Sequence, residues 1–226
     1  MPCSNGTGSE GMLSKDTQEI LMQAEDLELW RGERCLFRAL SFELPEGAVL
    51  HVSGANGCGK TSLLRVLCGL TEPEEGEIRW RGRSIRRCRD DYQHAFAWLG
   101  HLNGFKAELS ARANLAFSVS LRRETNPDVR NDTLDQVGLD SVADLPCRVL
   151  SAGQKRRLSL ATIMLSAAQL WILDEPFTNL DATGRAMISR MLDRHCANGG
   201  TAIVASHQDL GVEQRYLQHL EMEDTG

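Results

Sequence analysis

The sequence predicts an α/β fold built on a parallel sheet, and three short apolar runs carry that prediction. "AVLHVS" at 48–53, "LWILD" at 170–174 and "TAIVAS" at 201–206 have the length of buried strands, and helix-like segments lie between them. Strands that alternate with helices belong to parallel sheets with crossover connections. The chain has 226 residues, 42% hydrophobic and 25% charged, which suits one domain of this kind.

The first 88 residues predict a leader followed by mostly antiparallel strands. Residues 1–24 are polar and rich in Gly, Ser and Asn at their start, so we expect a flexible leader before a single domain over 25–226. Met12 and Met22 leave the true start of the chain open. "EDLELW" and "CLFRALSFELPEG" predict strands joined by a turn at Arg31–Gly32, and "EEGEIRWRGRSI" predicts an antiparallel excursion. Between them, "KTSLLRVLCGL" has the leucine spacing of a helix.

The character of the chain changes between about residues 89 and 149, where strand signals fade. "ELSARANLAFSVSLRR" and "NDTLDQVGL" predict helices there. We therefore expect residues 25–88 and 150–226 to form a core with an antiparallel β subdomain, and 89–149 to be an inserted helical subdomain. A helix should follow residue 154, and "ATGRAMISRMLDRHCANGG" should form another before the last apolar strand.

Composition and charge exclude several classes of protein. The net charge of −6 argues against a general nucleic-acid binder, which would more often be basic. No run approaches the roughly 18 apolar residues of a membrane span, and the N-terminus lacks the basic and apolar regions of a secretory signal. The seven cysteines show no C-x-x-C pair, which argues against a zinc site or a disulfide framework. We expect a cytoplasmic protein whose membrane role, if it has one, requires a partner.

The most specific local motif is a glycine-rich loop of the pattern G-x-x-x-x-G-K-T between an apolar strand and a helix. Glycines let backbone N–H groups approach phosphates closely, and the N-terminus of the following helix adds partial positive charge. The lysine reaches the β- and γ-phosphates and the threonine offers its hydroxyl to Mg²⁺. The predicted nucleotide contacts are Gly54, Ala55, Asn56, Gly57, Cys58, Gly59, Lys60, Thr61 and the neighbouring Ser62.

Two acidic residues stand at the C-terminal end of the apolar strand 170–174, one as its last residue and one directly after it. The C-terminal edge of a parallel sheet is where ligands bind, so Asp174 would hold Mg²⁺ and Glu175 would polarise the water that attacks the γ-phosphate. Adjacent strand residues point to opposite faces, so these two roles need a local twist before Pro176. His207 ends the last apolar strand on the same edge and could sense the γ-phosphate by hydrogen bonding.

A second loop of phosphate-binding character, "LSAGQ" at 150–154, lies before a basic helical segment. Ser151 can cap that helix, and the free N–H groups at its start favour an anion. This loop has no lysine of its own, although the chain already contains the lysine-bearing loop at 54–61.

In this order, the glycine loop, "LSAGQ", "LWILDEP", "TNLD" and "SHQ" resemble the ATP-binding cassette (ABC) superfamily over about residues 25–220. The resemblance implies a P-loop NTPase cassette with a RecA-like parallel core and two cassettes that meet head to tail around ATP. It makes Lys60, Glu175 and His207 catalytic. It also implies that Ser151, Ala152, Gly153 and Gln154 contact the partner cassette's ATP, that Asp181 contacts the dimer partner and that Trp30 stacks on adenine. Thr61, Asp174 and His101 are then the residues of the Mg²⁺ site.

The resemblance narrows to the ATP-binding subunits of cytochrome c maturation (haem exporter) systems. "ERCLFRALSF", "WLGHLNGFKAELSARANLAF" and "LSAGQKRRLSLA" carry it, and so does His101, which stands where generic ABC members have the glutamine that links Mg²⁺ to the membrane subunit. Asn114 departs from the glutamate common at its position. This resemblance implies an ATPase on the cytoplasmic face of the bacterial inner membrane that drives an integral permease. An ABC subunit for another small-molecule cargo is an alternative. A soluble ABC protein acting on DNA or ribosomes is a weaker one, since the sequence has no second cassette or basic arms.

Overall fold

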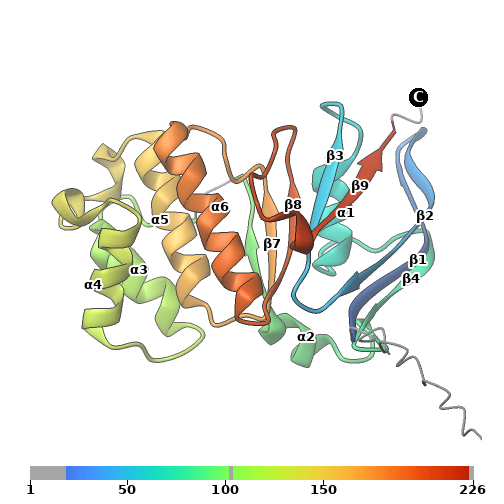
Figure 1. Ribbon diagram of the computed structural model, residues 1–226, viewed down its shortest axis with the longest axis horizontal. Coiled ribbons are helices and arrows are strands. Elements are labelled where there is room, and N and C mark those ends of the chain that lie inside the picture. The colour runs from blue at the N-terminus through green and yellow to red at the C-terminus, as the bar shows by residue number, and fades with distance from the viewer. Residues whose placement is uncertain (1–18, 102–103, 224–226) are drawn as a thin grey trace, which may run out of the picture.

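The computed structural model describes residues 19–101 and 104–223, which form two sheets and the helices around them (Figure 1). The antiparallel sheet has the order β2-β1-β4-β5 and the parallel sheet the order β6-β7-β8-β3-β9. The strands are β1 (Ile20–Arg31), β2 (Arg34–Pro45), β3 (Val49–Gly54), β4 (Glu75–Trp80), β5 (Arg83–Ser84), β6 (Phe96–Leu99), β7 (Leu170–Asp174), β8 (Thr201–Ala205) and β9 (Leu217–Met222). The predicted α/β class with a parallel core and an antiparallel subdomain is confirmed.

Helices cover both faces of the parallel sheet. α1 lies between it and the antiparallel sheet, α5 and α6 lie on its other face, and α3 and α4 pack beyond α5 (Figure 1). The α-helices are α1 (Lys60–Leu67), α2 (Arg89–Ala95), α3 (Ala111–Ser120), α4 (Pro127–Gln136), α5 (Ala152–Leu165) and α6 (Ala182–Ala197); short 3-10 turns occupy Asp140–Val142, Cys147–Val149 and Gln214–Tyr216. No helix in the described ranges is both long and apolar enough to cross a membrane.

Alternation along the buried strands divides the interior into two cores. On β3, Leu50 and Val52 pack with α1 and the antiparallel sheet, whereas Val49 packs with α5 and α6. Both faces of the sheet are therefore apolar, which explains the continuous apolar runs from which the strands were predicted. A third core joins α3 and α4 to the outer face of α5. The helix that follows residue 151 thus serves both the sheet and the helical subdomain.

The structure differs from the predicted organisation in two boundaries and one missing strand. β1 begins at Ile20, where Leu21 and Met22 are already buried, so the predicted leader over 1–24 ends too late; residues 1–18 lie outside the described part of the chain. The region 89–149 is not wholly a helical insert, because Phe96–Leu99 pairs with β7 as an edge strand of the parallel sheet. Strand β9, paired with β3, was not predicted at all. Both missed strands are short edge strands, whose sequence signal is weak without their neighbours.

Asn114, the departure noted in the sequence, is a buried structural residue of the helical subdomain. Its Oδ1 accepts the Lys106 N–H at 2.8 Å, and its Nδ2 lies 2.9 Å from Lys106 O and 3.0 Å from Leu109 O. These bonds fasten the loop before α3 onto that helix. An amide suits the position because it both donates and accepts, which a carboxylate cannot do.

Candidate functional site

The glycine loop of residues 54–61, called the phosphate loop below, joins β3 to α1 in a conformation that its glycines permit. Gly54 has φ +139° and Gly59 has φ +104°. A Cβ on Gly54 would lie 2.4 Å from the Met222 carbonyl oxygen, so the close packing of β9 also requires glycine there. Lys60 is buried, and its Nζ donates to Gly54 O at 2.7 Å and Ala55 O at 3.0 Å. The ammonium therefore lies inside the curve of the loop, where a phosphate would be held.

A cavity of about 440 Å³ opens beside the phosphate loop and brings most of the predicted site residues together. Gly54, Ala55 and Cys58 are not part of its wall, and the Cys58 side chain is buried. The lining residues are Arg31, Arg34, Leu36, Asn56, Gly57, Gly59, Lys60, Thr61, Ser62, His101, Asp174, Glu175, Thr178 and His207. One cavity is therefore lined by residues of β1 and β2, of the phosphate loop, and of the segments that carry His101, Asp174, Glu175 and His207.

The three residues predicted for the metal converge on the carboxylate of Asp174. Thr61 Oγ1 donates to Asp174 Oδ2 at 2.9 Å, and His101 Nε2 lies 3.3 Å from the same oxygen. Asp174 is 1% exposed, and its second oxygen, Oδ1, is buried and makes no hydrogen bond. A buried carboxylate oxygen without a partner is costly, and a cation bound there would satisfy it.

Glu175 turns away from β7 through a backbone conformation that is unusual for its residue type. Its φ is +46°, which supplies the twist expected between the two acids. Its N–H donates to Ala205 O at 2.9 Å, so the turn stays attached to β8. Its Oε2 lies 3.0 Å from His207 Nδ1, which pairs the carboxylate with the histidine at the end of the neighbouring strand. The predicted acid and histidine therefore face the same cavity.

The residue before His207 is held by a histidine that sequence reasoning did not select. His51 on β3 is buried, and its Nε2 lies 3.0 Å from Ser206 O. Burial lowers the pKa of His51, so the ring is neutral and its Nε2–H donates to that carbonyl. The loop that carries His207 is thereby tied to the centre of the parallel sheet.

Trp30, the residue predicted to stack on adenine, does not line the phosphate-loop cavity. Its indole Nε1 donates to Glu28 Oε1 at 2.6 Å, and the Arg38 guanidinium lies 5.3 Å from its ring centroid. Among the described residues, β1 and β2 contribute Arg31, Arg34 and Leu36 to the cavity wall, and not Trp30. Trp30 and its neighbour Arg31 point to opposite faces of the strand, and the stacking of Trp30 on adenine stays a prediction.

The loop of residues 151–154, called the signature loop below, is a complete helix N-terminus. Ser151 Oγ accepts the Gln154 N–H at 3.1 Å, and Gln154 Oε1 accepts the Ser151 N–H at 2.8 Å, which is a capping box. Ala152 is the first residue of α5, where an L-residue is comfortable. A Cβ on Gly153 would lie 2.7 Å from Asn179 O, so glycine there allows close contact with the segment after Glu175.

The signature loop borders its own surface hollow and shares no wall residue with the phosphate-loop cavity in the described part of the chain. Asp181 lies in this hollow, caps α6 by accepting the Gly184 N–H at 2.8 Å, and pairs with Arg157 at 3.0 Å. The Gly184 N–H and then Arg157 lower the pKa of Asp181, so the residue is a carboxylate. On a single chain the two loops therefore line two separate cavities.

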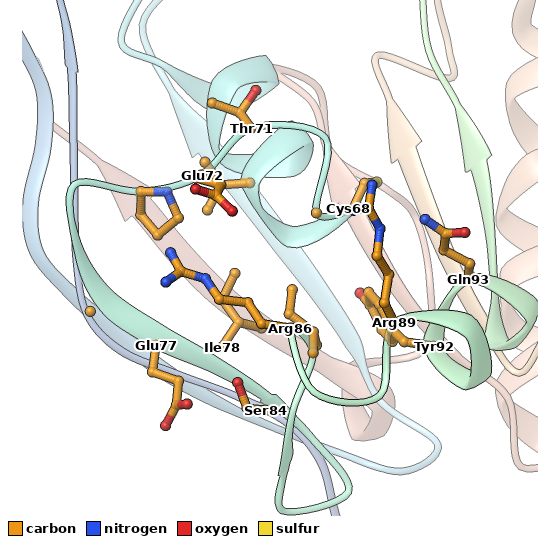
Figure 2. Close-up of a pocket in the computed structure, with 15 residues that line it drawn as sticks. Cys68, Thr71, Glu72, Glu77, Ile78, Ser84, Arg86, Arg89, Tyr92 and Gln93 are labelled. Carbon is orange, nitrogen blue, oxygen red and sulfur yellow. The ribbon is translucent and has the colours of Figure 1, made fainter.

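A second cavity, of about 220 Å³, lies beside the C-terminal end of α1 and is not the nucleotide site (Figure 2). β4, β5, α2 and the segment after Cys68 surround it, and it contains none of the predicted site residues. Tyr92 OH closes its inner end by donating to Leu67 O at 2.7 Å. Arg86, Arg89 and Glu72 give its rim charges of both signs, which does not favour an anionic ligand.

Two sets of comparisons define the class of protein. The family model described as "ABC transporter" matches residues 37–178. An ATP-binding ABC transporter protein from Pyrococcus furiosus has the same fold, with a TM-score of 0.76 and 22% identity over 89% of this chain and 96% of that chain. The chain belongs to the ABC transporter family and is an ATP-binding ATPase of that family.

Curated relatives narrow the comparison further. The "Cytochrome c biogenesis ATP-binding export protein CcmA" of Methylococcus capsulatus is 50% identical over 190 residues, which cover 84% of this chain and 92% of that protein. The protein of the same name from Nitrosomonas europaea is 44% identical over 201 residues, covering 88% and 94% respectively. The predicted resemblance to this group of ABC proteins is confirmed.

Proposed function

We propose that this chain is the ATP-hydrolysing subunit of an export system for c-type cytochrome biogenesis. The observation that carries the proposal is one cavity in which the phosphate loop, the Thr61–Asp174–His101 cluster and the Glu175–His207 pair meet. The names of its relatives supply the cellular process. Haem is the cargo or handover partner that the resemblance implies. The geometry of the ATPase site does not favour any other cargo.

Lys60 and the backbone of the phosphate loop would hold the β- and γ-phosphates of ATP. The α1 N-terminus begins at Lys60, so its free N–H groups point toward the same place. When the nucleotide is bound, Lys60 would exchange its two backbone carbonyl partners for phosphate oxygens.

Mg²⁺ fits the residues at Asp174. The Thr61 hydroxyl and the unpartnered Asp174 Oδ1 are oxygen ligands of the type that Mg²⁺ prefers, and His101 lies beside them. No group of three or more His, Cys, Asp or Glu side chains in the described residues could hold a metal alone, so the remaining ligands would come from phosphates and water. When bound, the ion would neutralise charge on the transferring phosphoryl group.

Glu175 and His207 would orient the attacking water. The Glu175 backbone N–H is bonded to Ala205 O, and its carboxylate contacts His207. The side chains of Glu175 and His207 both line the cavity. Glu175 would accept the hydrogen bond from water, and His207 would exchange its contact with Glu175 for a γ-phosphate oxygen, because a neutral imidazole has a single N–H to donate. The strained φ of Glu175 fits such a role, because strain of about 1–3 kcal/mol persists where the surroundings fix the geometry.

The base of the nucleotide would lie against the β1–β2 end of the cavity. Leu36 is buried and packs on Gly59, while Arg31 and Arg34 are exposed and line the same wall. A planar guanidinium can stack on a base as an aromatic ring does. Arg31 and Arg34 would thus take the role that the sequence assigned to Trp30.

The signature loop would act on the ATP of a second copy of this chain. Ser151, Gly153 and the α5 N-terminus would approach the γ-phosphate gripped by the partner's phosphate loop, and Asp181 would lie at the contact between cassettes. The separation of the two loops on one chain supports this head-to-tail pairing. It also explains why the signature loop needs no lysine, since the phosphate it covers is already held by one.

A membrane subunit would dock on the helical subdomain. Exposed apolar side chains lie on α3 and on the segments before α3 and before α5, and these segments are joined where Cys147 N donates to Leu109 O at 2.9 Å and Arg148 N to Ala107 O at 2.9 Å. The exposed fractions of these side chains are 36% for Leu109, 42% for Phe117, 45% for Leu145 and 55% for Val149. An exposed apolar patch of this kind is typical of an interface, here with an integral permease at the cytoplasmic face of the inner membrane.

The test is complementation of a strain that lacks this chain, with holo-cytochrome c as the readout. The intact chain should restore covalent haem attachment, and the Glu175→Gln chain should not, although it is made in equal amounts. Mass spectrometry of the membrane complex that co-purifies with the chain should identify an integral subunit. Normal cytochrome c levels in the deletion strain would refute the cellular role while leaving the ATPase assignment intact.

A further inference from the structure

Arg156 is a buried arginine whose guanidinium bonds, among the described residues, are to four backbone carbonyls. It lies in the second turn of α5, directly after the signature loop, and is 5% exposed. Its Nη2 lies 2.5 Å from Asp174 O and 2.7 Å from Glu175 O, and its Nε lies 3.2 Å from Pro176 O. Its Nη1 donates to Gly100 O at 2.8 Å.

These bonds join three segments that are far apart in the sequence. Asp174, Glu175 and Pro176 form the turn that carries the acids, and Gly100 immediately precedes His101. The same turn is held from its other side, because the Glu175 N–H donates to Ala205 O. The positive φ of Glu175 directs its carbonyl toward α5, where Arg156 receives it together with the carbonyls on either side.

We propose that Arg156 is a positioning residue for ATP hydrolysis. It holds the Glu175 turn and the residue before His101 in the geometry that the reaction requires, and it acts through them without touching the nucleotide. This inference rests on the proposed catalytic role of Glu175.

The chemistry of the side chain fits this role better than a packing role. An apolar residue such as Leu160, one turn later on the same face of α5, would fill the space but satisfy none of the four carbonyl contacts. Burial lowers the pKa of Arg156 and the charges of Asp174 and Glu175 raise it, and an arginine remains charged in either case. A planar fork of N–H donors is the group that can reach carbonyls of separate segments at once.

The experiment measures ATP affinity and ATP turnover separately in the full chain purified with its membrane partner. Arg156→Gln should lower kcat at least about tenfold and change the Kd for ATP less than about threefold, because the phosphate loop is untouched. Arg156→Lys keeps the charge but loses the fork, so its kcat should fall to an intermediate value. Millimolar guanidinium should restore part of the kcat of Arg156→Ala, whereas ammonium should not.

Arg123→Gln is the matched control. Arg123 also donates to a backbone carbonyl of α5, with its Nε 3.0 Å from Leu165 O, but at the end of the helix far from Glu175. Its kcat and Kd should equal those of the wild-type chain. Equal losses of kcat in Arg123→Gln and Arg156→Gln would show a general effect of loosening α5 and would overturn the proposal.

A double-mutant cycle with Glu175→Gln decides whether Arg156 acts through Glu175. If it does, Arg156→Gln should lower the residual hydrolysis of Glu175→Gln by less than about twofold, because little is left to position. A full additional tenfold loss, or an Arg156→Gln kcat within twofold of wild type, would overturn the proposal. Undiminished hydrolysis by Glu175→Gln alone would instead refute the catalytic assignment of Glu175 on which it rests.

Discussion

We expect both the phosphate loop and the signature loop to receive phosphate, yet only the first has the residues to bind it alone. The phosphate loop uses glycines with positive φ, a lysine inside its curve and a carboxylate opposite it. The signature loop has a capped helix N-terminus, and Arg157, which lines its hollow, is already paired with Asp181. Affinity for nucleotide is therefore concentrated in one loop.

In the proposed head-to-tail pair, this difference would let one copy of each loop per chain complete a closed active site. A helix N-terminus contributes about 0.3–1 kcal/mol toward an anion at an exposed site, which is too little to recruit ATP but enough to favour a closed state over an open one. The segment 175–181 runs between the two regions and carries Glu175 at one end and Asp181 at the other. Arg156 connects the signature helix to the catalytic turn within a single chain.

The largest effect should come from Glu175→Gln, which separates binding from hydrolysis. ATP hydrolysis should fall at least about 100-fold, since general-base groups typically contribute that much, while ATP stays bound. Because ATP would then bridge two chains without being cleaved, size-exclusion chromatography with ATP should show a dimer.

Glu213→Gln, at a surface ion pair with Arg215, serves as the control and should hydrolyse ATP normally. A Glu175→Gln chain that stays monomeric with ATP, both alone and with its membrane partner, would contradict the head-to-tail arrangement.

Mixing two impaired variants, one in each loop, tests directly whether the loops of different chains cooperate. Lys60→Ala should lose ATP binding, and Gly153→Ala should lose about tenfold in hydrolysis because its Cβ meets Asn179 O, with ATP affinity of the monomer unchanged. A mixed dimer contains one site with an intact phosphate loop and an intact signature loop. Activity of the mixture should therefore exceed that of either variant alone at the same total concentration.

Lack of recovery in a mixture shown to contain mixed dimers would mean that each chain uses its own signature loop, or that both sites must be intact.

The base end of the cavity should show a smaller effect, confined to affinity. Replacing Arg31 and Arg34 together with alanine should raise the Kd for ATP about tenfold, because stacking on a base contributes about 1–3 kcal/mol. The Kd for inorganic tripolyphosphate should not change, since it has no base. Trp30→Ala is the control and should bind ATP as the wild type does.

Arg31→Tyr in the Arg34→Ala background should recover affinity if the role is stacking. Loss of tripolyphosphate binding in the arginine variants would indicate that they contact phosphate instead.

His101→Gln should have little effect on the rate of ATP hydrolysis and a larger effect on the amount of holo-cytochrome c made in the cell. A glutamine can reach the Asp174 end of the cavity as His101 does, so hydrolysis should remain within about threefold. Coupling to the membrane subunit should weaken, which is measured as less holo-cytochrome c at equal protein levels. Unchanged cytochrome c maturation would show that His101 is not required to couple ATP hydrolysis to the membrane subunit.

The smallest effect on catalysis should come from His195→Gln. His195 lies in neither the phosphate loop nor the signature loop, but it affects the stability of the fold. Its ring stacks on Trp171 at 3.6 Å between centroids, and burial lowers its pKa to about 4. The unfolded chain takes up a proton near pH 6.5 and the folded chain does not, so this group's contribution is present above pH 6.5. It is lost as the pH falls toward 4, by about 3 kcal/mol in all.

Urea unfolding at pH 5 and pH 7 should show a smaller pH dependence of stability for His195→Gln than for the wild type, with ATP turnover at pH 7 per folded molecule unchanged. Equal pH dependence in the two proteins would contradict the buried neutral histidine.

Much of the candidate site was predictable because its motifs are local. The strand–loop–helix pattern at 48–70 places Lys60 and Thr61 at the edge of a sheet before any long-range contact is known. The same reasoning brought Asp174, Glu175 and His207 to that edge, since parallel strands end together. The twist at Glu175 was also predicted, because two neighbouring strand residues cannot otherwise face one cavity.

Arg156 shows why the rest was not predicted. In the sequence it belongs to a basic run, "KRR", which is typical of an exposed helix face. Its spacing to Leu160 and Ile163, at i+4 and i+7, was the signal that it faces inward. Burial of an arginine depends on acceptors supplied by other segments, and a helical pattern by itself does not show that such acceptors exist.

By itself, the sequence determined the α/β class, the two phosphate-type loops and the acids and histidine at the sheet edge, because these follow from periodicity and from motifs a few residues long. Only the tertiary structure decided that Arg31, not Trp30, lines the cavity, that Phe96–Leu99 and Leu217–Met222 complete the sheet, and that the two loops border separate hollows. Each of those outcomes depends on which face of a strand or helix meets a segment distant in the chain. That choice is made by the packing of the whole domain, since the free energy gained by burying one face depends on what covers it.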